Sequence, residues 1–192
     1  MRDLDIRSSL RLQLETAHAG DPDTLIIDEL GLCQGEARVD LAVVNGLIHG
    51  FEIKSARDTL ARLAGQAAVY DRALDAVSVV AARPHVDALF DRVPDWWGVH
   101  VASLAATDVI VEEIRPASTN PNVDPVAVAQ LLWREELMEI AVRLQLEPGP
   151  RARTKRRLWE LLARSLPLDE LRREVRRCLR ARKNWRLVPP PV

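Results

Sequence analysis

Several residue types are scarce in this 192-residue chain, and each scarcity excludes a kind of site. The only cysteines, Cys33 and Cys178, lie far apart without the spacing of a metal or redox motif. The four histidines are scattered, which gives no His/Cys cluster for zinc, and there is no glycine-rich phosphate loop. No apolar run approaches the roughly 20 residues of a membrane span, and the amino-terminal segment lacks the apolar core of a signal peptide. We therefore expect a cytoplasmic globular protein that makes no contact with a membrane.

Charged residues, in contrast, are plentiful and unevenly placed. Residues 143–186 contain 15 Lys or Arg and five Asp or Glu, whereas the rest of the chain contains 12 basic and 23 acidic residues. Such an asymmetry predicts a polyanionic partner, most commonly nucleic acid. It is equally compatible with basic helices that dock onto the acidic body of the same chain.

Hydrophobic periodicity and turn residues predict an α/β fold. Ile6, Leu10 and Leu14 recur at the spacing of a helix, and Asn45-Gly46 predicts an antiparallel hairpin between two strands. Ser55 and Asp58 have the spacing of a capping box, which predicts that a helix begins there. A β-branched apolar run at 76–82 predicts a buried parallel strand. The expected order is helix, three strands, helix and strand, at residues 5–18, 24–33, 37–44, 47–54, 55–74 and 76–82.

Residues 116–125, PASTNPNVDP, are rich in turn-forming residues and predict a linker after a core domain of residues 1–115. Within the core we also expect a short helix at 85–92 and strands at 98–104 and 108–114. A basic helical extension, residues 126–186, should follow the linker, since helical stretches are expected at 125–147, 154–165 and 168–183. Residues 187–192 predict an extended tail because they end in VPPPV.

Two carboxylates and an amine interrupt the apolar runs of the second and third predicted strands. Asp40 lies in one run; Glu52 and Lys54 lie in the next, on one face because side chains alternate along a strand. Buried charges are costly unless they are paired or bound to a metal. The alternatives are a surface ion pair of Glu52 with Lys54 and a solvent-facing pair of Asp40 with Arg38. We expect instead that the three groups converge.

A divalent cation would explain this convergence. Mg²⁺ (or Mn²⁺) would be held by the carboxylates of Asp40 and Glu52, with the main-chain carbonyl of Ile53 within reach. Lys54 would position the attacking water and offset charge on a phosphate, while the metal would lower the pKa of that water. These roles predict a metal-dependent phosphodiester hydrolase.

The pattern D-x11-E-x-K, placed after a helix and a first strand, resembles the PD-(D/E)XK nuclease superfamily. The segments GEARVDLAVVNG, HGFEIKSARDTLARLAGQ, LLWREE and RKNWR are similar to a bacterial family within it. The resemblance implies an αβββαβ restriction-endonuclease-like core with a mixed central sheet. It also implies hydrolysis of DNA and, for double-strand cuts, a homodimer. One departure is that this chain has Ala37-Arg38-Val39-Asp40 in place of the Pro-Asp sequence from which the superfamily takes its name.

The same resemblance implies further site residues. Glu29 on the first strand is the preferred additional acidic residue, with Glu15 and Glu36 as competitors that a surface or capping role explains equally well. Gln66 and Tyr70, one helical turn apart, correspond to a Gln and a Tyr that face the active site and the DNA backbone in some members. Arg62 extends this stripe, for which the alternative is a solvated helix face.

The basic extension supplies the expected phosphate contacts, which position nucleic acid without reading its sequence and weaken steeply with salt. Trp185 lies among basic residues, where it is placed to stack on bases. The expected contacts are Lys155, Arg156, Arg157, Arg176, Arg177, Arg182, Lys183 and Trp185. Two other functions stay open: a non-catalytic nucleic-acid-binding accessory protein, and a protein-interaction module whose basic helices dock an acidic partner.

Overall fold

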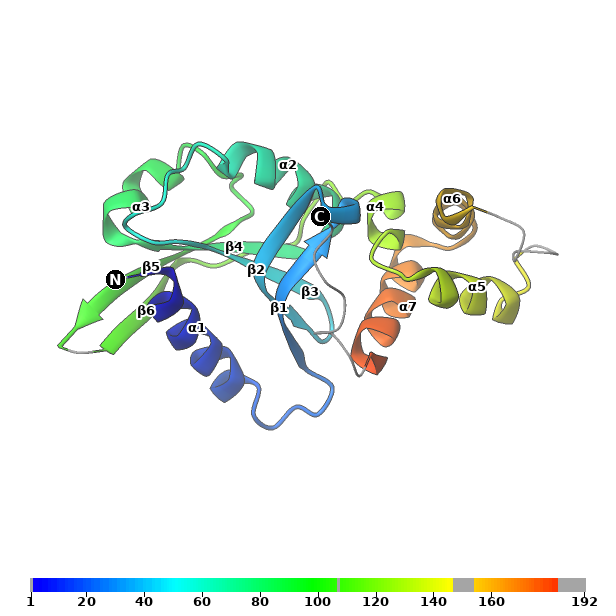
Figure 1. Ribbon diagram of the computed structural model, residues 1–192, viewed down its shortest axis with the longest axis horizontal. Helices are drawn as coiled ribbons and strands as arrows, with labels where there is room; N and C mark the ends of the chain where they lie inside the picture. The colour runs from blue at the N-terminus through cyan, green and yellow to red at the C-terminus, as the bar shows by residue number, and fades with distance from the viewer. Residues whose placement is uncertain (1, 107, 147–153, 183–192) are drawn as a thin grey trace.

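The computed structural model describes residues 2–106, 108–146 and 154–182, which form one mixed sheet with helices on both faces and a group of helices at one end (Figure 1). The elements are α1 (Asp3–Ala17), β1 (Leu25–Leu32), η1 (Cys33–Gly35), β2 (Ala37–Val44), β3 (Ile48–Lys54), α2 (Leu63–Ala73), β4 (Ala76–Ala82), α3 (Arg83–Leu89), β5 (Gly98–Ala105), β6 (Asp108–Arg115), α4 (Pro125–Ala129), α5 (Arg134–Arg143), α6 (Lys155–Ser165) and α7 (Leu168–Ala181). No helix among the described residues is both long enough and apolar enough to cross a bilayer.

The six strands lie in chain order across the sheet. β1, β2 and β3 pair antiparallel, β4 pairs parallel with β3 and β5, and β6 returns antiparallel to β5. The hairpin predicted at Asn45-Gly46 is confirmed, since Val44 pairs with Ile48 across it. β4 is buried along its whole length, as its β-branched sequence predicts for a central parallel strand. The predicted α/β class with a mixed sheet is therefore confirmed.

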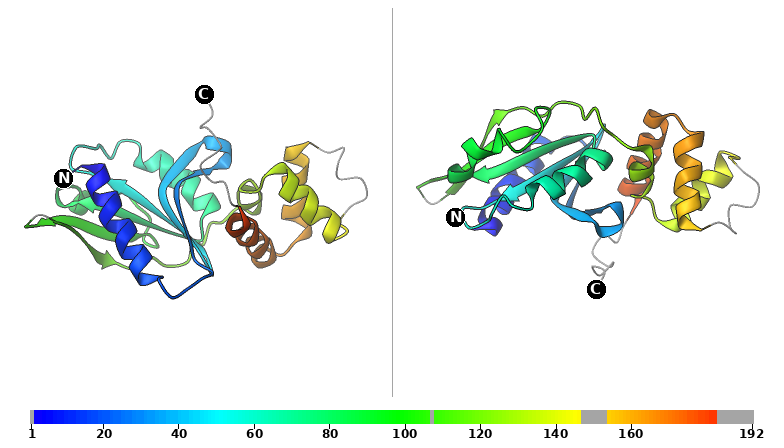
Figure 2. Two further views of the ribbon diagram at one scale, coloured as in Figure 1. Left: turned by 60° about the horizontal axis from the view of Figure 1, so that its bottom comes forward. Right: turned by 90° about the horizontal axis from the view of Figure 1, so that it is seen from above.

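Apolar side chains form a separate cluster on each face of the sheet. The smaller cluster packs α1 against the sheet and includes Ile6, Leu10 and Phe51. The larger one lies under α2 and continues into the C-terminal helices, where it includes Leu158 and Leu179. Because this cluster is continuous, the sheet and α4–α7 share one apolar core (Figure 2).

Two expected helices differ from those observed. The helix expected at 55–74 begins at Leu63. The Asp58 carboxylate does accept from both the backbone N and Oγ of Ser55, but Asp58 N bonds back to Ser55 O, so these contacts close a turn. The stretch expected at 125–147 is divided into α4 and α5. In both places the local pattern indicates that a helix is present more reliably than it indicates where the helix begins and ends.

Candidate functional site

The strands that carry Glu29 and Asp40 change face at these two residues. Ile27 and Leu30 both pack into the cluster under α2, as do Val39 and Ala42. Residues three apart share a face only where the alternation of a strand is interrupted, and in β1 the interruption coincides with the left-handed φ of 57° at Glu29. Just beyond, where the β2–β3 ladder ends at Leu41 and Phe51, Asp40 Oδ2 accepts from the backbone N of Ile53 at 2.7 Å.

Four polar side chains of β3 and α2 form a buried network. Lys54 Nζ lies 2.6 Å from Glu52 Oε1 and donates to Gln66 Oε1 at 2.9 Å. Gln66 Nε2 donates to Glu52 Oε1 at 2.6 Å, and the Tyr70 hydroxyl donates to Glu52 Oε2 at 2.5 Å. The side chains of Glu52 and Lys54 are only 3% and 7% exposed. The carboxyl end of β3 and one side of α2 thus bring together the four residues that the sequence analysis proposed for one site.

Asp40 is neutralised by an arginine from α1. Arg7 Nη2 lies 2.6 Å from Asp40 Oδ1, and Arg7 Nη1 donates to the Asp40 backbone oxygen at 2.9 Å. The same guanidinium lies 2.8 Å from a carboxylate oxygen of Glu29. Arg7 therefore links the first helix to both strands at their change of face.

The electrostatic environment is unfavourable for a second ionised carboxylate. Burial, and then the charge of Glu52, raise the pKa of Asp40 to about 6 despite the opposing effects of Ile53 N–H and Arg7. Burial and the Glu52 charge also raise the pKa of Tyr70, which keeps its phenol protonated as a donor. Burial by itself would lower the pKa of Arg7, but Asp40, Glu29 and Asp3 together raise it.

In this arrangement the expected ligands of the divalent cation already have protein partners. Both oxygens of Asp40 and both oxygens of Glu52 already accept hydrogen bonds from protein donors. Within the described residues no three His, Cys, Asp or Glu side chains gather so that they could hold a metal ion. Mg²⁺ requires several open oxygen positions, and here the positive charge beside Asp40 comes from Arg7. Mg²⁺ or Mn²⁺ stays a prediction.

The other predicted acidic residues lie apart from this network. Glu29 is 45% exposed and pairs with Arg7 and Arg38. Glu15 pairs with Arg11 within α1, and Glu36 pairs with Arg72 of α2. Arg62 is exposed at the start of α2. Ile53 contributes its backbone N–H to Asp40.

Much of the predicted nucleic-acid surface is occupied by contacts within the chain. Arg176 faces Asp75, and Arg177 pairs with Glu139 and Glu174. Arg182 pairs with Glu136 and stacks 4.2 Å from the centre of the Trp133 ring. Lys155 donates to Gln34 of η1 at 3.1 Å. Tyr70 is fully buried, whereas Arg156 and Arg157 are exposed. Lys183 and Trp185 lie outside the described residues.

Two residues of these clusters escaped the sequence analysis. Arg7 follows the apolar Ile6 on α1, and no local feature distinguishes it from Arg11 as the partner of Asp40. Asp75, just before β4, pairs with Arg172 as well as lying near Arg176. The only available signal for either was the need of a buried charge for a partner.

Comparisons with known proteins identify the family. The family described as bacteriophage P4 protein cII matches residues 6–186 of the chain. Protein cII of Enterobacteria phage P4 is 36% identical over 77 residues, which is 40% of this chain and 29% of that relative. The matched part of the chain thus spans less than a third of the relative's length. No solved structure gives a significant match.

These matches correct two expectations. Membership of the PD-(D/E)XK superfamily is wrong, and so is the metal-dependent nuclease function, with its hydrolase and restriction-endonuclease-like roles, because the matched family is that of a phage cII protein. The E-x-K pattern was misleading because it equally specifies a buried ion pair whose hydrogen bonds are completed by Gln66 and Tyr70. With 181 consecutive positions matched, from residue 6 to residue 186, the chain belongs to the family of bacteriophage P4 protein cII.

Proposed function

We propose that this protein binds nucleic acid through the exposed basic surface of α6. The observation that carries the proposal is that Arg157 and Arg164 are exposed and make no ion pair among the residues that the structure describes. Arg156 is also open to solvent, with 83% of its side chain exposed, and its ion pair within the described part of the chain is with Glu160 of its own helix.

The position of α6 supports this proposal. Its apolar side chains, including Leu158 and Leu162, pack into the core, which leaves the arginines on the outer side. α4 and α7 lie between most of α6 and the sheet (Figure 2), and only the start of α6 reaches the body within the described residues, where Lys155 donates to Gln34 of η1. Basic side chains on an outer helix contact phosphates without reading sequence. The expected partner is therefore a nucleic-acid backbone rather than a particular base sequence.

Fluorescence anisotropy with short duplex DNA, single-stranded DNA and RNA tests the proposal. The double variant Arg156→Gln/Arg157→Gln should weaken binding, and its plot of log affinity against log salt should be shallower by about 2, since each lost contact with duplex DNA reduces the slope by about 0.9. The measurements should span roughly 50 to 200 mM salt.

The matched control is Arg83→Gln/Arg92→Gln, which removes the same charge from exposed positions on and after α3. It should leave the salt slope nearly unchanged. Equal losses in the two double variants would mean that net charge, and not the α6 surface, determines binding, and the proposal would fail.

A further inference from the structure

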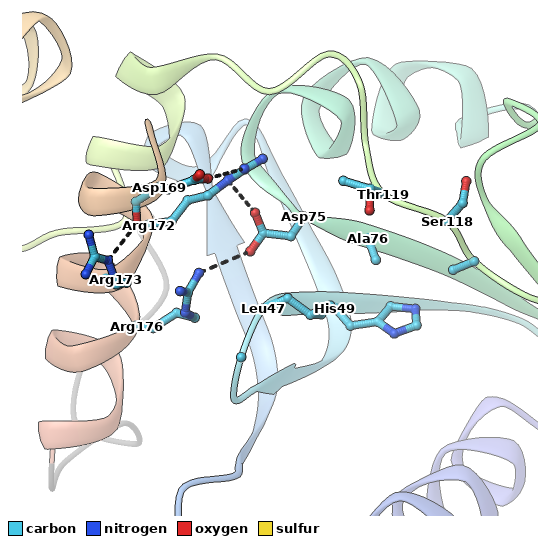
Figure 3. Close-up of a pocket in the computed structure, with 12 residues that line it drawn as sticks. Leu47, His49, Asp75, Ala76, Ser118, Thr119, Asp169, Arg172, Arg173 and Arg176 are labelled. Atoms are coloured by element: carbon cyan, nitrogen blue, oxygen red, sulfur yellow. Dashed lines mark hydrogen bonds and ion pairs between the residues drawn. The ribbon is translucent and has the colours of Figure 1, made fainter. Parts of the chain in front are cut away.

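A cavity of about 510 Å³ opens between α7 and the sheet. Its wall combines the starts of β3 and β4, the segment that follows β6 and one face of α7 (Figure 3). It lies at the opposite end of β3 from Glu52 and Lys54, because His49 lines it near the start of that strand. The cavity is therefore separate from the buried network described above.

Two arginines of α7 share one carboxylate in this wall. Arg172 Nε lies 2.7 Å from Asp75 Oδ1, and Arg176 Nη1 lies 3.8 Å from Asp75 Oδ2. The same Oδ2 also accepts from the backbone N of Ile48 at 2.8 Å. Asp169 lies 3.2 Å from Arg172, but its side chain is 88% exposed, so water screens this pair. Among the described residues, Asp75 is thus the buried counter-charge shared by two arginines that are themselves only about 15% exposed.

Arg173 adds a third cation to the wall. Its Nε makes a long bond of 3.4 Å to the backbone oxygen of Asp169, and it forms no ion pair within the described part of the chain. Burial lowers the pKa of Arg176, and among the charges around it Asp75 opposes this effect while Arg172, Arg180 and Arg173 add to it. His49 is uncharged at neutral pH because burial lowers its pKa to about 4. The described lining therefore carries an excess of positive charge.

The rest of the lining is apolar or carries hydroxyl groups. Leu47, Ala76 and Ala117 form an apolar surface, and Ser118 and Thr119 lie next to it. Figure 3 shows the arginines on one side of the cavity, with Ser118, Thr119 and His49 on the other. This pairing of a cationic wall with an apolar one suits a ligand that has a charged group and a compact organic part.

We propose that this cavity binds a small phosphate monoester of about the size of a nucleoside 5′-monophosphate. The phosphoryl group would lie among Arg172, Arg173 and Arg176, because guanidinium groups present paired donors that match phosphate oxygens. The organic part would lie against Leu47, Ala76 and Ala117. The volume falls within the roughly 300–1,000 Å³ of small-molecule sites.

Calorimetry on the full chain tests this site with three probes: inorganic phosphate, adenosine 5′-monophosphate and adenosine. Both phosphates should bind, the monophosphate more tightly, and adenosine should not bind measurably. Arg173→Gln should weaken binding of the monophosphate about tenfold or more, as expected for the loss of a charge-assisted hydrogen bond. This residue is exposed and makes no described ion pair, so the variant should fold normally.

A second pair of variants tests the effect of an added negative charge in the cavity without changing its arginines. Gly46 lines the cavity, and a Cβ added there meets no atom within 4 Å. Gly46→Glu should therefore weaken phosphate binding severalfold, whereas its neutral counterpart Gly46→Gln should bind within about twofold of wild type. Arg177→Gln is the control on α7, because Arg177 pairs with Glu139 and Glu174 and does not line the cavity.

Two outcomes would overturn the proposal. One is no saturable binding of either phosphate; the other is binding that Arg173→Gln and Gly46→Glu leave unchanged. Nucleic-acid binding by the Arg156→Gln/Arg157→Gln variant is a separate readout, so failure at the cavity and failure at α6 are distinguishable.

Discussion

The two ends of β3 carry charged clusters of opposite character. At its carboxyl end, Glu52 is enclosed by Lys54, Gln66 and Tyr70, and each of its oxygens has a protein donor. At its amino end, Asp75 pairs with Arg172 and lies near Arg176 in the wall of a cavity of about 510 Å³. The first cluster is closed and locally neutral, whereas the second is open and has an excess of positive charge.

This difference separates a structural role from a binding role. A buried charge with complete partners must give up a protein hydrogen bond before it can bind a ligand, and removal of one partner leaves the other buried and uncompensated. An arginine cluster beside a cavity retains unused donors and admits water. We therefore expect substitutions in the closed cluster to change stability strongly, and substitutions around the cavity to change ligand binding more than stability.

The largest effect is expected for Glu52→Ala. Lys54 would keep its charge at 7% exposure without a carboxylate, and breaking a buried ion pair typically costs about 3–5 kcal/mol of unfolding free energy. Urea denaturation should measure this loss, with Glu113→Ala, at a 54% exposed position, as the control. Adding Lys54→Met to Glu52→Ala should recover part of the loss because the stranded amine is removed. A loss below about 1 kcal/mol would mean that the cluster is not closed to water.

A somewhat smaller effect, confined to a range of pH, is expected at Asp40. Its pKa is about 6 in the folded protein against 3.8 for the free side chain, so the folded state holds the proton more tightly than the unfolded state. Stability should therefore be higher near pH 4 and fall as the pH rises to about 6, by about 3 kcal/mol at most.

The variant Asp40→Asn should lack this contribution. Unfolding free energies measured between pH 4 and pH 7 should fall less steeply for the variant than for wild type. Asp28→Asn, which changes a 42% exposed carboxylate on β1, provides the comparison. Parallel curves for wild type and Asp40→Asn would contradict the assignment of a raised pKa to this residue.

The smallest effect is expected for Asp75→Asn, in the open cluster. The variant keeps an oxygen for the backbone N of Ile48 but loses the charge shared by Arg172 and Arg176. Water in the neighbouring cavity can solvate the two arginines, so we expect a loss of about 1–2 kcal/mol in urea denaturation, below that of a fully buried pair. Asp95→Asn, at a fully exposed position, is the reference. A loss as large as that of Glu52→Ala would erase the distinction between the two clusters.

The order of helices and strands along the chain and the pairing of β2 with β3 were predictable because they depend on local features. Asn45-Gly46 specifies the reversal, and alternation places Glu52 and Lys54 on one face. The one-turn spacing of Gln66 and Tyr70 likewise placed both on the side of α2 that meets Glu52. The start of α2 was predicted too early, since the Ser55–Asp58 contact closes a turn.

The nuclease function drawn from the same residues was wrong, because the chain matches the family of bacteriophage P4 protein cII. A carboxylate, an amine and a second carboxylate on adjacent strands form a metal site only if oxygens are left open. Whether they are left open depends on Arg7, which lies 33 positions before Asp40 and reaches it only in the folded chain. Spacing within β2 and β3 contains no information about this contact.

Composition also did not predict which of the basic residues form ion pairs within the chain and which stay exposed. The excess charge of residues 143–186 was equally compatible with a nucleic-acid surface and with docking onto the acidic body. The folded chain divides the set: Arg172, Arg176 and Arg182 face acidic groups of the same chain, while Arg157 and Arg164 remain exposed on α6.

Local pattern alone thus indicated most of the strands and helices and the shared face of Glu52 and Lys54, because backbone periodicity and turn chemistry act over a few residues. Only the tertiary structure decided the partner of each charge, because Coulomb attraction and desolvation depend on neighbours that the chain brings from far away. In this member of the phage P4 cII family, contacts between distant residues bury and pair the carboxylates of β2 and β3, and they leave an arginine-lined cavity beside α7.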